Sequence, residues 1–138
     1  MGYTSEIITS IIAITAVVAT VIIATVSNKN VKTQNEMQLR TMIFGVKKAL
    51  NEVKYGAEKE GEKEKFYLRE LAKSYEIACE QFKKGKLDKQ YFKMAYLKEI
   101  LEFVTENESV LYTDVVEYNF TLKTILEYKL EQTNNLKN

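Results

Sequence analysis

The chain of 138 residues has no histidine, no proline and no tryptophan, and its single cysteine is Cys79. Without histidine there is no Ser-His or Cys-His nucleophile, no imidazole base near neutral pH and no histidine-ligated zinc site. One cysteine cannot form an internal disulfide, so nothing indicates an oxidising compartment. We therefore expect a non-enzymatic protein without cofactor or metal, and we interpret Cys79 as a buried or half-buried thiol.

Glycine is also scarce, and none of the five glycines belongs to a GxGxxG or GxxxxGK phosphate-binding loop. The charge is nearly balanced, with 20 Lys and Arg against 19 Asp and Glu, whereas a nucleic-acid surface needs an excess of basic residues. We expect neither nucleotide hydrolysis nor nucleic-acid binding. The lack of helix-breaking residues, together with much Lys, Glu, Leu and Tyr, predicts an all-α fold with long helices.

One run, residues 7–26 (IITSIIAITAVVATVIIATV), contains no charged, amide or aromatic side chain. At ~1.5 Å of rise per residue, a helix of this length covers about 30 Å, the thickness of the hydrocarbon core of a bilayer. We predict that residues 1–27 form a short outer tail and a transmembrane helix. A cleaved signal peptide is the main alternative, but the tail before this run lacks the basic residues that such a peptide carries.

The charges that flank this run predict its orientation. Lys29, Lys32 and Arg40 follow it, whereas only Glu6 precedes it. Basic flanks stay on the cytoplasmic side of a membrane. We therefore expect a single-pass protein of the inner (plasma) membrane, with its N-terminus outside and its C-terminal domain in the cytoplasm.

Small residues recur through the run at spacings of three and four, which places them on one helix face. They are Thr9, Ala13, Ala16, Thr20 and Ala24. A second helix can approach such a face closely, and hydroxyl groups can bond across it. This pattern predicts a homo-oligomer in the membrane; the alternative is that the threonines bond back to their own helix and the face has no role.

Apolar periodicity divides the remaining residues into segments. Residues 28–56 are predicted to be a stalk or first cytosolic helix that continues the membrane helix, and residues 57–65 a charged loop. Residues 66–133 are predicted to form a cytosolic bundle, giving about three to four helices in all, and residues 134–138 a frayed tail.

Within the bundle, a coiled-coil-like seam of three-four spacing comprises Leu68, Leu71, Tyr75, Ala78 and Phe82. A basic cluster follows it, consisting of Lys83, Lys84, Lys86 and Lys89. Gly85 within this cluster is typical of a helix C-terminus, and Asp88 of the cap of a next helix over Lys89–Thr105. The lysines complement the end of the helix, and the alternative is that they contact anionic lipid headgroups.

The segment from Glu108 to Gln132 fits two patterns. Alternation across residues 110–123 is typical of a strand, but the length of the segment and the lack of a partner strand favour a helix. Two groups of carboxylates share helix faces by spacing, and we interpret them as solvated. They are Glu76 with Glu80, and Glu99 with Glu102 and Glu106.

The chain consists of one span, the polar stretch NKNVKTQNEMQLR and then about a hundred residues of tyrosine-rich helices. In this architecture it resembles small bacterial and phage-borne single-pass membrane proteins of unknown function. Some proteins of this build accompany antiviral defence systems. Our first hypothesis is a membrane-anchored protein that self-associates or binds a partner protein at the cytoplasmic face. The alternative hypothesis is an oligomeric effector that opens a pore or depolarises the membrane in a bacterial or phage defence or toxicity system.

Overall fold

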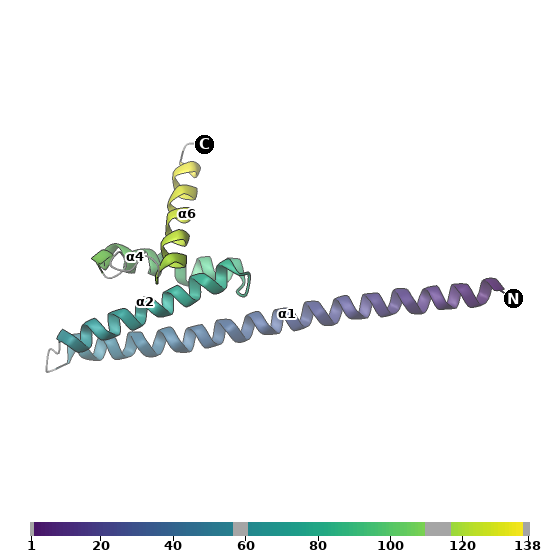
Figure 1. Ribbon diagram of the computed structural model, residues 1–138, viewed down its shortest axis with the longest axis horizontal. Coiled ribbons are helices and arrows are strands. Elements are labelled where there is room, and N and C mark those ends of the chain that lie inside the picture. The colour runs from purple at the N-terminus through teal and green to yellow at the C-terminus, as the bar shows by residue number, and fades with distance from the viewer. Residues whose placement is uncertain (1, 57–60, 110–116, 137–138) are drawn as a thin grey trace. The chain divides into compact units, whose positions relative to one another are not determined.

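The computed structural model describes residues 2–56, 61–109 and 117–136, and every regular element among them is a helix. The elements are α1 (Gly2–Tyr55), α2 (Gly61–Lys83), α3 (Lys89–Phe92), the π-helical turn η1 (Lys93–Leu97), α4 (Lys98–Glu106) and α6 (Asn119–Asn135) (Figure 1). The predicted all-α class is confirmed for these residues.

Helix α1 is one continuous helix through the apolar run and the amphipathic segment after it, as predicted. The chain has no proline to interrupt it, and Gly45 alone does not break the helix. The chain nevertheless divides into two compact units, Met1–Gln34 and Asn35–Asn138. We call them the N-terminal and the C-terminal unit.

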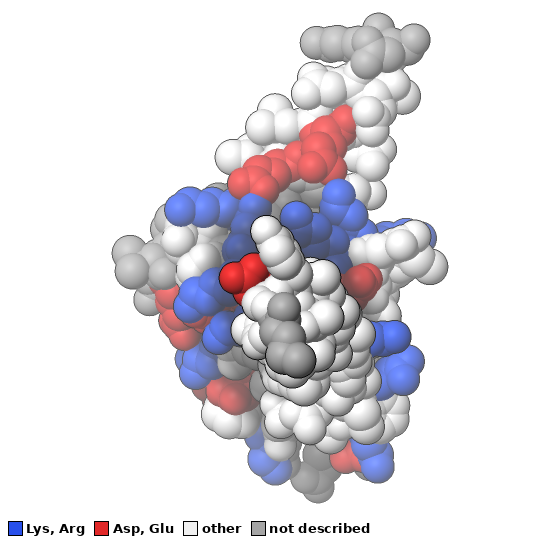
Figure 2. All heavy atoms as spheres, turned by 90° about the vertical axis from the view of Figure 1, so that its right-hand side faces the viewer, with Lys and Arg blue, Asp and Glu red and all other residues white. Residues whose placement is uncertain are grey.

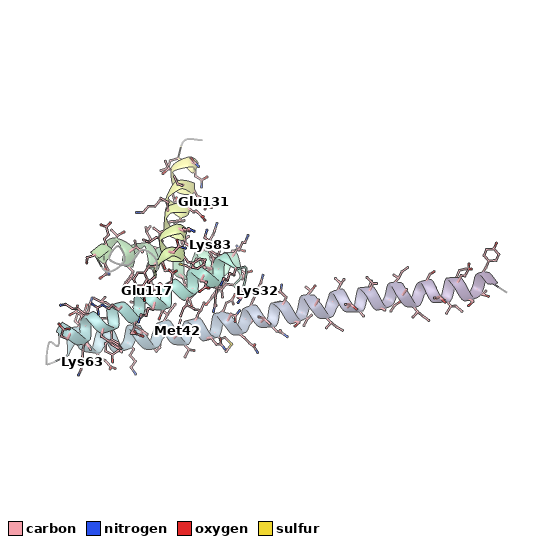
Figure 3. All side chains as sticks on the ribbon, in the orientation of Figure 1. Lys32, Met42, Lys63, Lys83, Glu117 and Glu131 are labelled. Atoms are coloured by element: carbon pink, nitrogen blue, oxygen red, sulfur yellow. The ribbon has the colours of Figure 1, made fainter. Side chains whose placement is uncertain are left out.

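The N-terminal unit is a bare helix. From residue 2 to residue 31 every side chain is exposed to solvent, including all the isoleucines and valines of the apolar run. Figure 3 shows these side chains projecting from all sides of the helix. This part of the chain has no core of its own.

The C-terminal unit has a single hydrophobic core. Its first helix is the end of α1 from residue 35 onward, which runs antiparallel to α2 and buries Leu39, Ile43 and Leu50 (Figure 1). These residues therefore build the bundle rather than a free stalk. The core is completed by residues from the other helices and from the turns before α3 and α6, namely Leu71, Ala72, Tyr75, Ala78, Cys79, Leu87, Phe92, Tyr96, Leu97, Ile100, Phe103, Val104, Tyr118 and Ile125.

Helix α2 begins at Gly61, so residues 61–65, expected to belong to a charged loop, are helical. Acidic residues Glu62 and Glu64 lie in the first turn, where they favour the positive end of the helix dipole. Glu62, Lys63 and Lys65 are exposed and Glu64 is half-buried, so this turn adds little to the core. Residues 57–60 of the expected loop lie outside the described residues.

The connection after α2 has the predicted capping residues. Gly85 has φ of +70°, and the Lys86 amide donates to the Gln81 carbonyl at 2.9 Å, which is a Schellman-type C-cap. Asp88 then caps α3, because its carboxylate accepts a bond from the Tyr91 amide at 2.8 Å. Both local predictions are confirmed.

Two hydrogen bonds join this connection to α1. The Asn35 side chain donates to the Lys86 carbonyl at 3.0 Å, and the Asp88 amide donates to the Glu36 carboxylate at 3.2 Å. They attach the connection to the start of the C-terminal unit.

The helix predicted for Lys89–Thr105 is one helical run that contains the π turn η1. A π turn takes one more residue than an α turn, so residues five apart come onto the same face. Tyr91 and Tyr96 pack edge to face in this way, with ring centroids 6.0 Å apart and planes at 79°.

Helix α6 answers the helix-or-strand question for residues 119–123, which are helical; residues 110–116 lie outside the described residues. The strand pattern is wrong there because a distant side chain stabilises the helix start. The Glu76 carboxylate on α2 accepts bonds from the amides of Phe120 and Thr121, both at 2.8 Å, and from the Thr121 hydroxyl at 2.6 Å. The interpretation of Glu76 as a solvated carboxylate is therefore wrong. At its other end α6 reaches Asn135, into the expected frayed tail.

Candidate functional site

The apolar part of α1 is long and apolar enough to cross a membrane, with a mean hydropathy of 2.7 over its most apolar 18 residues, none of which is buried. A core helix of a soluble protein can be equally apolar, but its side chains are covered by the rest of the fold. Here Ile7, Ile14 and Ile23 are all more than half exposed. Seen end-on in Figure 2, this helix presents mainly uncharged atoms.

The threonine hydroxyls of this helix bond to their own backbone. Each donates to the carbonyl four residues earlier: Thr9 to Ser5, Thr15 to Ile11, Thr20 to Ala16 and Thr25 to Val21, at 2.8 to 2.9 Å. These protons are therefore not free to bond across to a second helix. The predicted packing face (Thr9, Ala13, Ala16, Thr20 and Ala24) is exposed along one continuous helix, and it offers close approach rather than hydroxyl donation.

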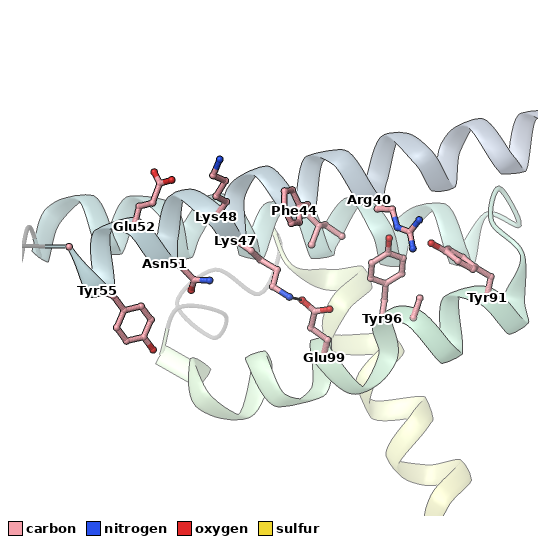
Figure 4. A pocket seen from close by; sticks show the side chains of 13 residues that line it. Arg40, Phe44, Lys47, Lys48, Asn51, Glu52, Tyr55, Tyr91, Tyr96 and Glu99 are labelled. Atoms are coloured by element: carbon pink, nitrogen blue, oxygen red, sulfur yellow. Dashed lines mark hydrogen bonds and ion pairs between the residues drawn. The ribbon is translucent and has the colours of Figure 1, made fainter.

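A second feature, the α1–α4 groove, lies within the C-terminal unit and has a volume of about 870 Å³ (Figure 4). One wall is α1 from residue 40 onward, and the other is formed by α3, η1 and α4. Its lining residues are Arg40, Ile43, Phe44, Lys47, Lys48, Asn51, Glu52, Tyr55, Gly56, Tyr91, Ala95, Tyr96 and Glu99. Nothing in the periodicity of the sequence predicts this groove, because it depends on the π turn and on how the helices pack.

The α1 wall carries exposed aromatic side chains. Phe44 is 68% exposed and Tyr55 is 84% exposed, although Ile43, directly before Phe44, is buried in the core. Large apolar side chains that line a concave surface are typical of binding sites. Lys48 and Glu52, also on α1, point away from the α4 wall (Figure 4).

Glu99 joins three helices at the base of the groove. Its carboxylate accepts a bond from the Lys47 ammonium of α1 at 2.5 Å and from the Tyr75 hydroxyl of α2 at 2.6 Å. Burial, followed by this bond to Glu99, raises the pKa of Tyr75 well above its ordinary value. The interpretation of Glu99 as a solvated carboxylate is wrong, because it is the polar link between α1, α2 and α4.

Arg40 stands at the other end of the groove beside Tyr96 and Tyr91 (Figure 4). Within the described parts of the chain, no carboxylate lies within salt-bridge distance of its guanidinium, whereas Lys47 is paired with Glu99. Burial, followed by the interaction with the Tyr91 hydroxyl, raises the pKa of Tyr96 above its ordinary value, so its hydroxyl stays neutral. This end of the groove thus combines one unpaired cation with two phenol groups.

Cys79 is fully buried, as predicted. Burial raises the pKa of its thiol from its ordinary value of 9.0 to about 12, although the hydroxyls of Thr124 and Thr121 oppose this shift. The thiol is therefore protonated and shielded at neutral pH, which is the opposite of a reactive cysteine.

Part of the basic cluster after α2 is already paired within the C-terminal unit. Lys83 forms an ion pair with Glu127 of α6, and Lys84 pairs with Glu80 and lies 5.9 Å from the centre of the Phe120 ring. Figure 2 shows acidic side chains along α6 with lysines beside them. Lys86 and Lys89 remain exposed.

No protein-family model, curated protein or solved structure matches this chain. Two candidate sites remain, an uncovered apolar helix in one unit and, in the other, a groove with Arg40 at one end.

Proposed function

We propose that this chain is a non-enzymatic, single-pass membrane protein that is anchored by α1 and presents its helical C-terminal unit to the cytoplasm for self-association or for binding a partner protein. The observation that carries the proposal is the complete exposure of the apolar run, of which no residue is buried. Left in water, such a surface would aggregate, whereas a bilayer covers it on all sides.

The orientation follows from the charges next to the run. Lys29 and Lys32 lie within the helical turns after it and Glu6 before it, so the positive side faces the cytoplasm. The C-terminal unit, with its balanced surface charge and its own core, is then a soluble domain at the inner face of the plasma membrane.

Membrane integration is tested by expressing the full chain and extracting the membranes with alkaline carbonate. We expect the protein to remain in the membrane pellet and its intact mass to be that of the full 138 residues. A shorter, extractable product that begins after residue 26 would identify a cleaved signal peptide and overturn the proposal.

The orientation is tested by cysteine labelling. Ser5→Cys should react with a membrane-impermeant maleimide in intact cells, and Glu102→Cys only after lysis. Cys79 can stay in both variants because it is buried and its thiol is protonated. Labelling of Glu102→Cys in intact cells would reverse the proposed topology.

Self-association is tested by crosslinking in membranes. Ala16→Leu/Thr20→Leu widens the small-residue face and should abolish the crosslinked ladder. Val18→Leu/Ile22→Leu lies on the opposite side of the helix and is the matched control, with the ladder retained. A chain that is strictly monomeric before any substitution contradicts self-association. Depolarisation of the cells that only the first pair abolishes would instead favour the alternative function, an oligomeric effector.

A further inference from the structure

We propose that the α1–α4 groove binds an amphipathic organic anion, that is, a carboxylate or phosphate carried on an apolar body. The anionic head would lie at Arg40, beside the hydroxyls of Tyr91 and Tyr96, and the body would lie against Ile43, Phe44 and Ala95. All of these residues belong to the C-terminal unit. The inference therefore does not depend on whether α1 spans a membrane.

The head position follows from charge. Lys47 and Glu99 reach toward each other across the groove in Figure 4, and their charges neutralise each other. Arg40 is left with a positive charge, and a guanidinium matches the planar oxygen pair of a carboxylate or two oxygens of a phosphate. A cationic ligand would meet the same charge with repulsion.

The two tyrosines complete the head site. The edge-to-face contact between Tyr91 and Tyr96 holds both rings in place, and the π turn is what brings residues five apart onto one face. Phenol hydroxyls donate hydrogen bonds to an anion. Because the rings are held by packing, little ordering is needed when a ligand binds.

The body position follows from the exposed apolar side chains. Phe44 is 68% exposed at the side of the groove, and burying it under a ligand would remove apolar surface from water. The volume of about 870 Å³ lies within the range of small-molecule sites. The groove is therefore large enough for an aromatic or aliphatic body beside the head.

The test uses the full chain in nanodiscs of zwitterionic lipid, titrated with 2-naphthoate and with 2-naphthyl phosphate and followed by calorimetry. These probes distinguish a carboxylate from a phosphate head, and 2-naphthylmethylammonium supplies the same body with a positive head. Empty nanodiscs give the background from partition into lipid. We expect saturable binding of at least one anion and none of the cation. Equal binding of anion and cation, or no saturable binding of either anion, would overturn the proposal.

Variants then locate the site. Arg40→Gln removes the exposed cation and should weaken binding of the anion about tenfold or more. Arg69→Gln on α2 is the matched control, because it makes the same substitution at an exposed arginine that does not line the groove. If Arg40→Gln fails to fold by circular dichroism, Phe44→Ala replaces it, since Phe44 is exposed and lies at the body position. Affinity that changes equally in the tested variant and in the Arg69 control would place the anion outside this groove.

Discussion

The two ends of α1 differ in how their apolar residues are distributed around the helix axis. Between Ile7 and Val26 every side chain is exposed and apolar residues surround the helix, whereas between Leu39 and Leu50 a stripe of apolar residues is buried and Phe44 lies exposed outside it. An apolar stripe implies a protein core on one side and water on the other, while apolar residues all round imply an apolar solvent. The distribution of apolar residues around the axis thus indicates the surroundings for which each end is built.

Charged substitutions in the two ends of α1 should differ most in their effect on membrane insertion. Val17→Arg/Val21→Arg puts two cations in the middle of the apolar run, each costing about 2.5–3.5 kcal/mol of insertion free energy. We expect loss of the carbonate-resistant membrane fraction. Met37→Arg/Thr41→Arg has the same spacing at exposed positions of the C-terminal unit and should leave that fraction unchanged. Retention of the first variant in the membrane would contradict the comparison.

An isoleucine-to-alanine substitution should also lower stability by different amounts at the two ends of α1. Ile43→Ala empties a buried position and should lower the free energy of unfolding of the C-terminal unit by about 2–5 kcal/mol. Ile14→Ala, at an exposed position of the same helix, should leave it within about 0.5 kcal/mol. Urea unfolding in nanodiscs, followed by tyrosine fluorescence, measures both. Equal losses would mean that Ile14 also packs against protein.

The long-range cap of α6 should show a smaller effect. Glu76→Gln keeps one acceptor but removes the negative charge from the start of α6, and should cost about 1–2 kcal/mol of stability. Hydrogen exchange should accelerate at the amides of Phe120 and Thr121, because both donate hydrogen bonds to the Glu76 carboxylate. Glu102→Gln is the control, because its carboxylate is mostly exposed and pairs only loosely with Lys98. Unchanged exchange in Glu76→Gln would show that α6 starts without this cap.

The buried thiol should have the smallest effect, and only in alkali. In the unfolded chain Cys79 ionises near its ordinary pKa of 9.0, whereas in the folded state its pKa is about 12. The contribution of the Cys79 thiol to the free energy of unfolding is therefore fully present below pH 9.0. It is lost as the pH rises toward about 12, because in this range only the unfolded state releases the proton. Cys79→Ala should flatten this alkaline loss in urea unfolding. A slope identical to that of the unmodified chain would contradict the assignment.

Local signals in the sequence predicted the features that depend on neighbours along the chain. The apolar periodicity of residues 28–56 predicted that this segment is helical, and Gly85 and Asp88 marked the turn after α2 correctly. Each of these depends on residues within one or two helical turns.

The features that were missed depend on distant contacts. Glu76 and Glu99 look like solvated carboxylates because their spacing shows only their own helix, whereas their partners are 44 or 45 residues away for Glu76, and 24 and 52 residues away for Glu99. One local sign of the first contact exists: Tyr118, at the N-cap of α6, makes no side-chain cap bond, so the helix needs an acceptor from elsewhere. The groove adds the π turn, for which no residue spacing is diagnostic.

The self-bonded threonines of α1 also bear on the order of events during biogenesis. A hydroxyl proton that already has an acceptor on its own helix can leave water without a second chain present. We therefore expect single copies to insert first and to meet afterwards, by diffusion within the membrane plane. The degree of assembly would then follow the density of copies in the membrane, so that the expression level would set how far the protein oligomerises.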